Sequence, residues 1–195
     1  MARNPARRAA LVDAAIEVLA HEGARGLTFR AVDAQAAVPA GTASNYFADR
    51  DDLLNQAGRH IHVRLAPEES ALAELMDAPR SRELVYRLMR DLVARMLGDR
   101  AGYLALLELR LEATRRPALR AALTRTLREN LKRNVDFHRE AGLPDDGDTV
   151  LRLYFSITGL LVEYLTAPGV LDEHELDDLV GILVDSALGI GPHHR

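Results

Sequence analysis

Apolar residues recur three and four positions apart along almost the whole chain, which is the spacing of one face of an α-helix. The first such stripe is formed by Leu11, Ala14, Ala15, Val18 and Leu19. No segment shows the sustained alternation of apolar and polar residues, enriched in β-branched side chains, that a half-buried strand requires. The pattern therefore predicts an all-α protein.

Capping residues, glycines and prolines divide this pattern into about nine helices. Gly23 and Gly26 end the first helix, and Thr28 and Asp49 are N-caps of the second and fourth helices. Asp172 and Glu175 have the spacing of a capping box at the start of the last. The predicted helices are residues 5–21, 28–37, 40–46, 49–65 (after which Pro67 kinks or divides the helix), 81–97, 101–115, 117–140, 148–165 and 172–188.

Four short elements followed by longer ones predict a small N-terminal head, residues 1–48, on a helical body, residues 49–195. With 195 residues, of which 48% are apolar, the chain can bury a substantial core. The absence of Cys excludes disulfides and thiolate metal sites and favours a cytoplasmic protein. The longest apolar stretch, residues 154–165, contains Glu163 and is too short to span a bilayer, so no membrane partner is expected.

The stretch from Thr28 to Leu54 follows the helix-turn-helix plan: a helix, a turn of about three residues and a short second helix. This second helix is small and polar, with the sequence Gly41-Thr42-Ala43-Ser44-Asn45, where a core helix would carry more aliphatic bulk. Small side chains allow close approach to DNA, and hydroxyl and amide groups can bond to base edges and phosphates. The net charge of −4 argues against a protein that coats nucleic acid along its length, but it does not exclude a local DNA-binding face.

This region resembles the TetR family of transcription regulators. The matching residues, between Leu11 and Leu54, are Ala14, Ala15, Gly23, Thr28, Val32, Ala36, Val38, Gly41, Thr42, Phe47, Arg50, Leu53 and Leu54. The chain length and the all-helical body are similar more loosely. The resemblance implies a bacterial, ligand-responsive regulator, more specifically a repressor, that binds a palindromic operator as a homodimer and is released by a small-molecule effector.

The sequence departs from the family pattern within the motif. At Ser44 an aromatic residue common in the family is absent, with Tyr46 following two positions later, and three further departures matter more. Ala37 stands where the family usually has Gly, so the turn must accept a Cβ atom. Pro39 replaces the usual Ser N-cap, and Asp33 replaces a small residue. We expect the last two departures to be linked, with the Asp33 carboxylate accepting hydrogen bonds from the N–H groups that open the short helix.

The resemblance also implies roles for individual residues of the motif. The residues expected to hold phosphates are Thr28, Tyr46 and Arg50. Those expected to face the major groove are Thr42, Ser44 and Asn45, with Ala40 close enough to touch a thymine methyl group. Arg30 completes the expected DNA-binding set. Each residue alone has an equally good structural explanation, and only their combination favours DNA binding.

The helix after Pro117 carries a polar line of Thr126, Asn130, Asn134 and His138 beside an apolar line of leucines. The polar line is explained either as a solvated edge or as the polar wall of a ligand cavity, since such cavities are mostly apolar with a few polar groups. The apolar remainder of a cavity would come from Tyr86, Met89, Tyr103, Leu107 and Tyr154, each of which also fits an ordinary core. Such a cavity would take a hydrophobic or amphipathic effector.

The last two predicted helices carry more apolar surface than one partner can cover. Residues 150–165 are apolar nearly all round, and residues 172–188 carry one apolar stripe. In the TetR family this pair forms a four-helix dimer interface. The interface residues predicted here are Leu153, Gly159, Leu160, Tyr164, Leu176, Leu179, Val180, Leu183 and Val184.

Two other classes of function stay open. One is a helical small-molecule-binding protein without DNA binding, and the other is a helical enzyme. His60 and His62 are two apart on a helix and point to different sides, which makes a metal pair there unfavourable. No Ser-His-Asp arrangement or Gly-rich phosphate loop is indicated, so we predict no catalytic residues, no metal site and no cofactor.

Overall fold

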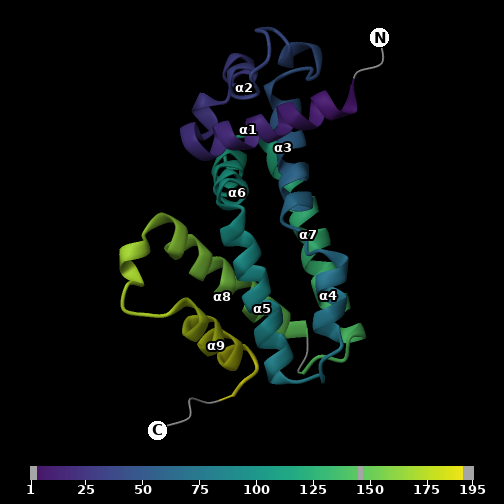
Figure 1. Cartoon of the computed structure of the whole chain (residues 1–195), viewed down its shortest axis with the longest axis vertical. Coiled ribbons are helices and arrows are strands. Elements are labelled where there is room, and N and C mark those ends of the chain that lie inside the picture. Colours follow the sequence, from purple (N-terminus) through teal and green to yellow (C-terminus); the bar gives the residue numbers. More distant parts are fainter. Residues whose placement is uncertain (1–3, 145–146, 191–195) are drawn as a thin grey trace. The chain divides into compact units, whose positions relative to one another are not determined.

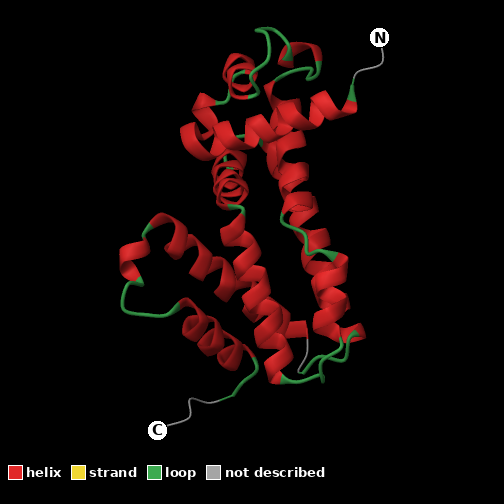
Figure 2. Cartoon of the chain, viewed as in Figure 1, coloured by secondary structure: helices red, strands yellow, loops and turns green. Residues whose placement is uncertain are grey.

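The computed structural model describes residues 4–144 and 147–190, and every regular element within these ranges is helical (Figure 2). In chain order (Figure 1) the elements are α1 (Pro5–Gly26), α2 (Phe29–Gln35), the 3-10 helix η1 (Ala43–Asn45), α3 (Arg50–Arg64), α4 (Glu69–Met76), α5 (Arg82–Gly98), α6 (Arg100–Ala113), α7 (Pro117–Glu140), α8 (Gly147–Thr166), the 3-10 helix η2 (Pro168–Val170) and α9 (Leu176–Ala187). The all-α prediction is confirmed. Among the described helices none has the length and apolarity needed to cross a membrane.

The helices form two compact units. The first is drawn from Met1–Ala66 and Asp99–Leu127 and contains α1, α2, η1, α3, α6 and the start of α7. The second is drawn from Pro67–Gly98 and Arg128–Arg195 and contains α4, α5, the rest of α7, α8 and α9. The units therefore differ from the expected division after residue 48, because the buried face of α3 packs with α1 and α6 in one core.

In the first unit, α1 packs on α2, α3 and α6. Its apolar stripe is fully buried at Leu11, Ala15 and Leu19. Gly23 has φ +68° and ψ −178°, a conformation that costs little only for glycine, so it interrupts the helical path of α1, and a short turn over residues 24–26 follows this kink.

In the second unit, α9 packs on α5 and α8. Arg82 of α5 donates through Nε to Asp185 Oδ1 of α9 at 2.7 Å. The predicted capping box at Asp172 and Glu175 is wrong, because a turn delays the start of α9 to Leu176. Glu175 is the N-cap of α9, and its side chain makes no capping hydrogen bond.

Candidate nucleic-acid interface

The helix-turn-helix is built from α2, a turn and η1. Thr28 is the N-cap of α2, and its Oγ1 accepts from the N–H of Ala31 at 3.1 Å. Ala37 has φ +50°, so the turn does accept a Cβ atom in the left-handed region that usually favours glycine. The short helix predicted over residues 40–46 is a single 3-10 turn, Ala43–Asn45, because Gly41 at φ +88° interrupts a helical start after Pro39.

Asp33 supplies the N-cap of this short turn from the neighbouring helix. Its side chain is buried, with the residue 2% exposed, and the N–H groups of Gly41 and Ala43 each donate to its carboxylate at 2.7 Å. Thr42, the residue at the N-cap position of η1, makes no side-chain capping bond. The expected link between Asp33 and Pro39 is therefore confirmed: a carboxylate on α2 accepts the N–H hydrogen bonds that a Ser N-cap at position 39 would otherwise accept.

The residues predicted to face the major groove lie at the surface of this turn. Ala40, Ser44 and Asn45 are exposed, and Thr42 is half-buried. Their donors bond to the local backbone: Thr42 Oγ1 donates to Pro39 O at 2.5 Å, Ser44 Oγ to Gly41 O at 2.8 Å and Asn45 Nδ2 to Gly41 O at 3.0 Å. Acceptor capacity therefore remains on these side chains for donors on base edges. Their role in reading bases stays a prediction.

The residues predicted to hold phosphates are not equivalent. Thr28 and Arg30 are exposed, whereas Tyr46 is half-buried. The guanidinium carbon of Arg8 lies 5.9 Å from the centroid of the Tyr46 ring, and Arg8 Nη1 donates to Gln56 Oε1 at 2.8 Å. Arg8 thus places a cation beside the rings of Tyr46 and Phe47, next to the recognition turn.

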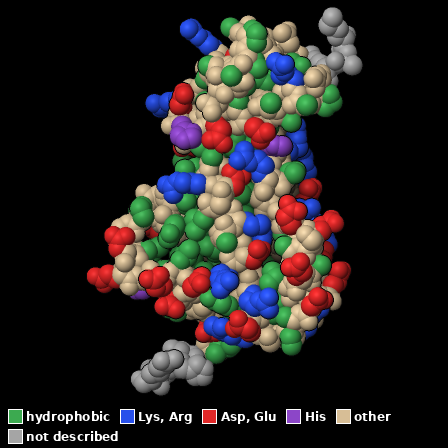
Figure 3. Space-filling model, in the orientation of Figure 1, with side chains coloured by type: hydrophobic (Ala, Val, Ile, Leu, Met, Phe, Trp, Pro, Cys, Tyr) green, Lys and Arg blue, Asp and Glu red, His purple; other side chains and the backbone are tan. Residues whose placement is uncertain are grey.

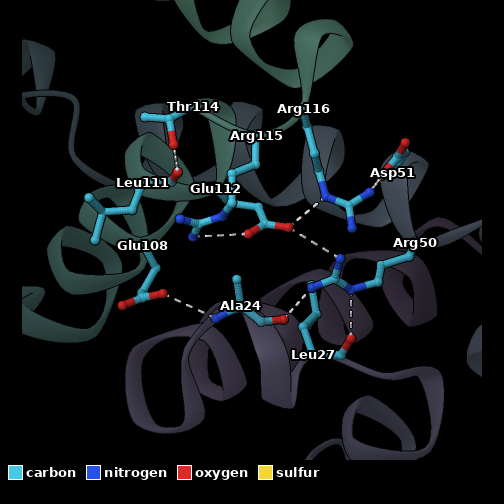
Figure 4. A network of polar contacts seen from close by, with 10 residues as sticks. All are labelled: Ala24, Leu27, Arg50, Asp51, Glu108, Leu111, Glu112, Thr114, Arg115 and Arg116. Carbon is cyan, nitrogen blue, oxygen red and sulfur yellow. Dashed lines mark hydrogen bonds and ion pairs between the residues drawn. The ribbon is translucent and has the colours of Figure 1, made fainter.

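Arg50 lies among acceptors of the protein itself (Figure 4). Its Nε donates to Leu27 O at 3.1 Å, its Nη2 donates to Ala24 O, and its Nη1 lies 3.5 Å from Glu112 Oε1. Ala24 lies near the end of α1, Leu27 directly follows α1, and Glu112 lies on α6. The predicted contact of Arg50 with a phosphate stays a prediction, and it now competes with this internal arrangement.

Glu112 is the centre of the same network. It is 9% exposed, and Arg116 Nε donates to its Oε1 at 2.6 Å, while Arg116 Nη1 donates to Asp51 Oδ1 at 2.5 Å. The hydrogen bond from Arg116, with the positive charges of Arg116 and Arg50, holds the pKa of the Glu112 carboxyl below its ordinary value against the opposing effect of burial. Sequence reasoning missed Glu112, because its pairing with Arg116 four residues later is an ordinary helical spacing and its third partner, Arg50, is 62 positions away.

Acid should weaken the fold through Glu112. Because the pKa of this carboxyl is lowered on folding, its stabilising contribution is complete above the pKa of an unfolded glutamate and is lost as pH falls through the lower folded value. We expect the free energy of unfolding to fall more steeply between about pH 5 and 3 in the wild type than in Glu112→Gln. Denaturant titrations across this pH range measure the free energy of unfolding. Glu129 is an exposed glutamate of α7, so Glu129→Gln is the control. Parallel curves for wild type and Glu112→Gln would contradict the expectation.

The residues predicted to form the polar wall of a ligand cavity lie in different environments and do not share one face. Asn134 is exposed, Asn130 is half-buried and accepts from Arg133 Nη2, and His138 is buried with Nε2 2.8 Å from Pro144 O. Positions four apart drift by about 40° around a helix, so a line of this length turns from one environment into another. The residues therefore share a sequence spacing without sharing a surface.

The predicted apolar lining is divided between the two units. Tyr103 and Leu107 lie on α6 in the first unit, where Tyr103 is buried. Tyr86, Met89 and Tyr154 are half-buried in the second unit, where the Tyr86 ring lies beneath Arg82 and close to Gly181 of α9. None of the eight predicted ligand-binding residues lines the open groove of about 290 Å³ in the first unit, which is formed by Arg110, Ala113, Thr114, Arg120, Leu123, Thr124 and Leu127.

The predicted dimer residues fall into two groups. Leu153, Leu160, Val180 and Val184 are buried within the single chain, so they belong to its own core. Gly159 and Tyr164 are exposed, and Leu176, Leu179 and Leu183 are half-buried. The apolar side chains most exposed on α8 and α9 are Phe155 and Ile182, which were not predicted. Figure 3 shows hydrophobic side chains gathered over α8.

Comparison with known proteins extends these observations. Residues 11–57 match the bacterial regulatory proteins of the tetR family, and residues 80–188 match the tetracyclin repressor-like C-terminal domain. The HTH-type transcriptional regulator BetI of Burkholderia mallei is 38% identical over 77 residues, a stretch that covers 39% of this chain and 40% of that relative. The chain thus spans less than half the length of this curated relative.

Solved structures are similar over almost the whole chain. A member of the TetR family from Streptomyces coelicolor is 30% identical with a TM-score of 0.71, covering 94% of this chain and 98% of that one. The multidrug binding protein EbrR, complexed with ethidium, is 29% identical with a TM-score of 0.69, covering 95% and 99%. The fatty acid degradation regulator FadR from Bacillus halodurans, at 22% identity and a TM-score of 0.70 over the full length of both chains, supports the fold alone.

The helix-turn-helix, the all-helical architecture and these matches define a DNA-binding transcriptional regulator. The chain belongs to the TetR family. Members of this family are transcription factors rather than enzymes.

Proposed function

We propose that the chain is a repressor that binds a palindromic operator as a homodimer and releases it when a small effector binds. The observation that carries this proposal is the buried Asp33 cap, which holds Ser44 and Asn45 at the surface on a short turn. A rigid turn with small exposed polar side chains suits entry into the major groove. Two such turns related by a two-fold axis would read half-sites roughly 34–36 Å apart, or farther by whole turns of DNA.

The homodimer is supported by the position of the apolar surface. Among the described residues, six of the eight large apolar side chains that are exposed lie on or beside α8 and α9: Leu151, Phe155, Tyr164, Val170, Ile182 and Ile190. A surface of this kind on one pair of helices is typical of an association site. A second copy of the chain would cover it symmetrically.

The effector is proposed to be hydrophobic or amphipathic and to bind in the helical body. EbrR, which is similar over nearly the whole chain, has been crystallised with ethidium, a planar aromatic cation. An effector releases DNA only if it binds the DNA-incompetent arrangement more tightly than the competent one. A coupling free energy of about 1–3 kcal/mol would lower operator affinity roughly 5–150-fold.

A gel shift with DNA from beside the chain's own gene tests the proposal. Asn45→Ala should weaken binding by about 1–3 kcal/mol at one base pair and relax the preference there, because amide contacts to base edges carry sequence information. Arg30→Ala should instead weaken binding to all sequences and lower the salt slope by about one. An Asn45→Ala protein that ranks operator variants as the wild type does would contradict the role of Asn45. Failure of the wild type to bind any duplex would favour a ligand-binding protein without DNA binding.

A further inference from the structure

The end of α1 is held from both sides by side chains of other helices (Figure 4). The N–H of Ala24 donates to Glu108 Oε2 of α6 at 3.1 Å, and Ala24 O accepts from Arg50 of α3. Arg50 also donates to Leu27 O and pairs with Glu112 of α6. We call the side chains of Arg50, Glu108 and Glu112, together with the backbone of residues 24–27, the α1–α6 clasp.

The chemistry of this clasp suits its position. Ala24 O and Leu27 O lie in and after the short turn that follows Gly23, where main-chain carbonyls keep acceptor capacity for a cationic donor. The planar guanidinium of arginine can donate to two carbonyls and a carboxylate at once, which the ammonium of lysine cannot do with the same geometry. Gly23 brings the backbone close to Glu108, because a Cβ at this position would lie 3.2 Å from Glu108 Oε2.

The clasp ends directly at the start of the DNA-binding motif. Leu27, whose carbonyl Arg50 holds, is followed by Thr28, the N-cap of α2, and α2 carries Asp33, the cap of the recognition turn. Hydrogen bonds therefore connect Glu112 of α6 to Arg50 and Arg50 to Leu27, and the chain itself connects Leu27 to Thr28 at the start of α2.

We propose that Arg50 and Glu112 are positioning residues for DNA binding, which fix the helix-turn-helix on the C-terminal end of α6. Arg50 acts here through Glu112 and the α1 carbonyls rather than through a phosphate. This inference rests on the proposed function, because its effect is measured as DNA affinity.

Charge and geometry give opposite expectations for Glu112. Glu112→Gln removes a negative charge, so long-range electrostatics alone would strengthen binding to the phosphate backbone. The clasp instead requires the charged carboxylate, and we expect Glu112→Gln to bind DNA roughly tenfold more weakly, a free-energy change of about 1.4 kcal/mol. Arg50→Lys keeps the positive charge that a phosphate contact needs but lacks the guanidinium fork. We expect the same loss for Arg50→Lys, with the slope of log affinity against log salt unchanged.

The experiment measures affinity for the duplex from beside the gene, and for an unrelated duplex, over a range of salt concentrations. Both single variants and Arg50→Lys/Glu112→Gln are compared, and the double variant should be no weaker than the weaker single variant, because both changes break one unit. Glu129→Gln is the matched control: it makes the same change of charge as Glu112→Gln at an exposed residue of α7, so it should change affinity only slightly.

Hydrogen exchange supplies a readout that does not depend on DNA. In Arg50→Lys and Glu112→Gln the amides of residues 24–35 should exchange faster, while those of α8 and α9 keep their wild-type rates. Tighter binding by Glu112→Gln, or wild-type binding and exchange in both variants, would overturn the clasp while leaving the proposed function intact. If the wild type bound no duplex, the proposed function would fail, and exchange over residues 24–35 would still decide whether the clasp positions α2.

Discussion

Asp33→Ala is expected to weaken operator binding roughly 100-fold or more, because the N–H groups of Gly41 and Ala43 at the start of the recognition turn lose their acceptor. Ala43 is completely buried, so its N–H has no access to water as a replacement partner. Hydrogen bonds to a charged group contribute about 1.5–3 kcal/mol each, and two are lost here. We therefore also expect the free energy of unfolding to fall by about 3 kcal/mol.

Graded substitutions separate loss of the cap from general damage. Asp33→Asn keeps one carbonyl acceptor and should lie between Asp33→Ala and the wild type. In the Asp33→Ala background, Pro39→Ser should restore part of the affinity, because a serine at this position can cap the N–H of Gly41 or Thr42. Gln35→Ala, an exposed polar residue on the same helix, is the control. Operator affinity and the free energy of unfolding are measured for each variant. An Asp33→Ala protein with the same two values as Gln35→Ala would contradict the expectation.

The cap was visible in the sequence because it is local. Asp33 and Pro39 are both departures from the pattern of one short motif. A carboxylate close to N–H groups without partners is expected to accept hydrogen bonds from them. Arg50 was different. Its acceptors are two main-chain carbonyls, which carry no sequence signature, and a glutamate 62 positions away. A motif shared with a family therefore indicated a phosphate contact, and only the folded chain shows the competing partners.

The helical body shows a second limit of sequence patterns. Helix α8 is apolar on most faces, so its sequence predicts two covered sides without saying which residues belong to which. Leu153 and Leu160 were predicted for the dimer, but they are buried within the single chain. Phe155, two positions from Leu153 and on another face, is the residue left exposed. The choice between faces depends on where α5 and α9 pack, which no local spacing encodes.

The exposed face of α8 has the geometry of a helix-packing surface. Leu151, Phe155, Gly159 and Val162 follow one another at steps of four, four and three residues, so they form one stripe. Phe155 is 64% exposed, and Ile182 of α9 is 59% exposed. A Cβ built on Gly159 would meet nothing within 4 Å, so the stripe has a gap where a second helix can approach closely.

Phe155→Arg is therefore expected to convert the proposed dimer into monomers. In a two-fold interface the substitution appears twice, and each copy would bury a charge without a partner, which costs several kcal/mol. The dimer dissociation constant should rise by roughly three orders of magnitude or more, since each 1.4 kcal/mol is a factor of ten. Operator affinity should fall with it, because one recognition turn reads only one half-site. Sedimentation equilibrium and gel shifts measure the two effects.

The controls decide whether the effect belongs to this face. Leu111→Arg introduces the same charge at an apolar residue of α6 that is 57% exposed, and it should leave the dimer intact. Phe155→Leu keeps an apolar contact and should weaken association only slightly. Gly159→Ala adds to the gap a Cβ atom that would meet nothing of its own protomer within 4 Å, so it should destabilise the dimer without lowering the stability of the monomer. A Phe155→Arg protein that remains dimeric at low concentration would place the interface on another surface, and the stripe on α8 would then need a different partner.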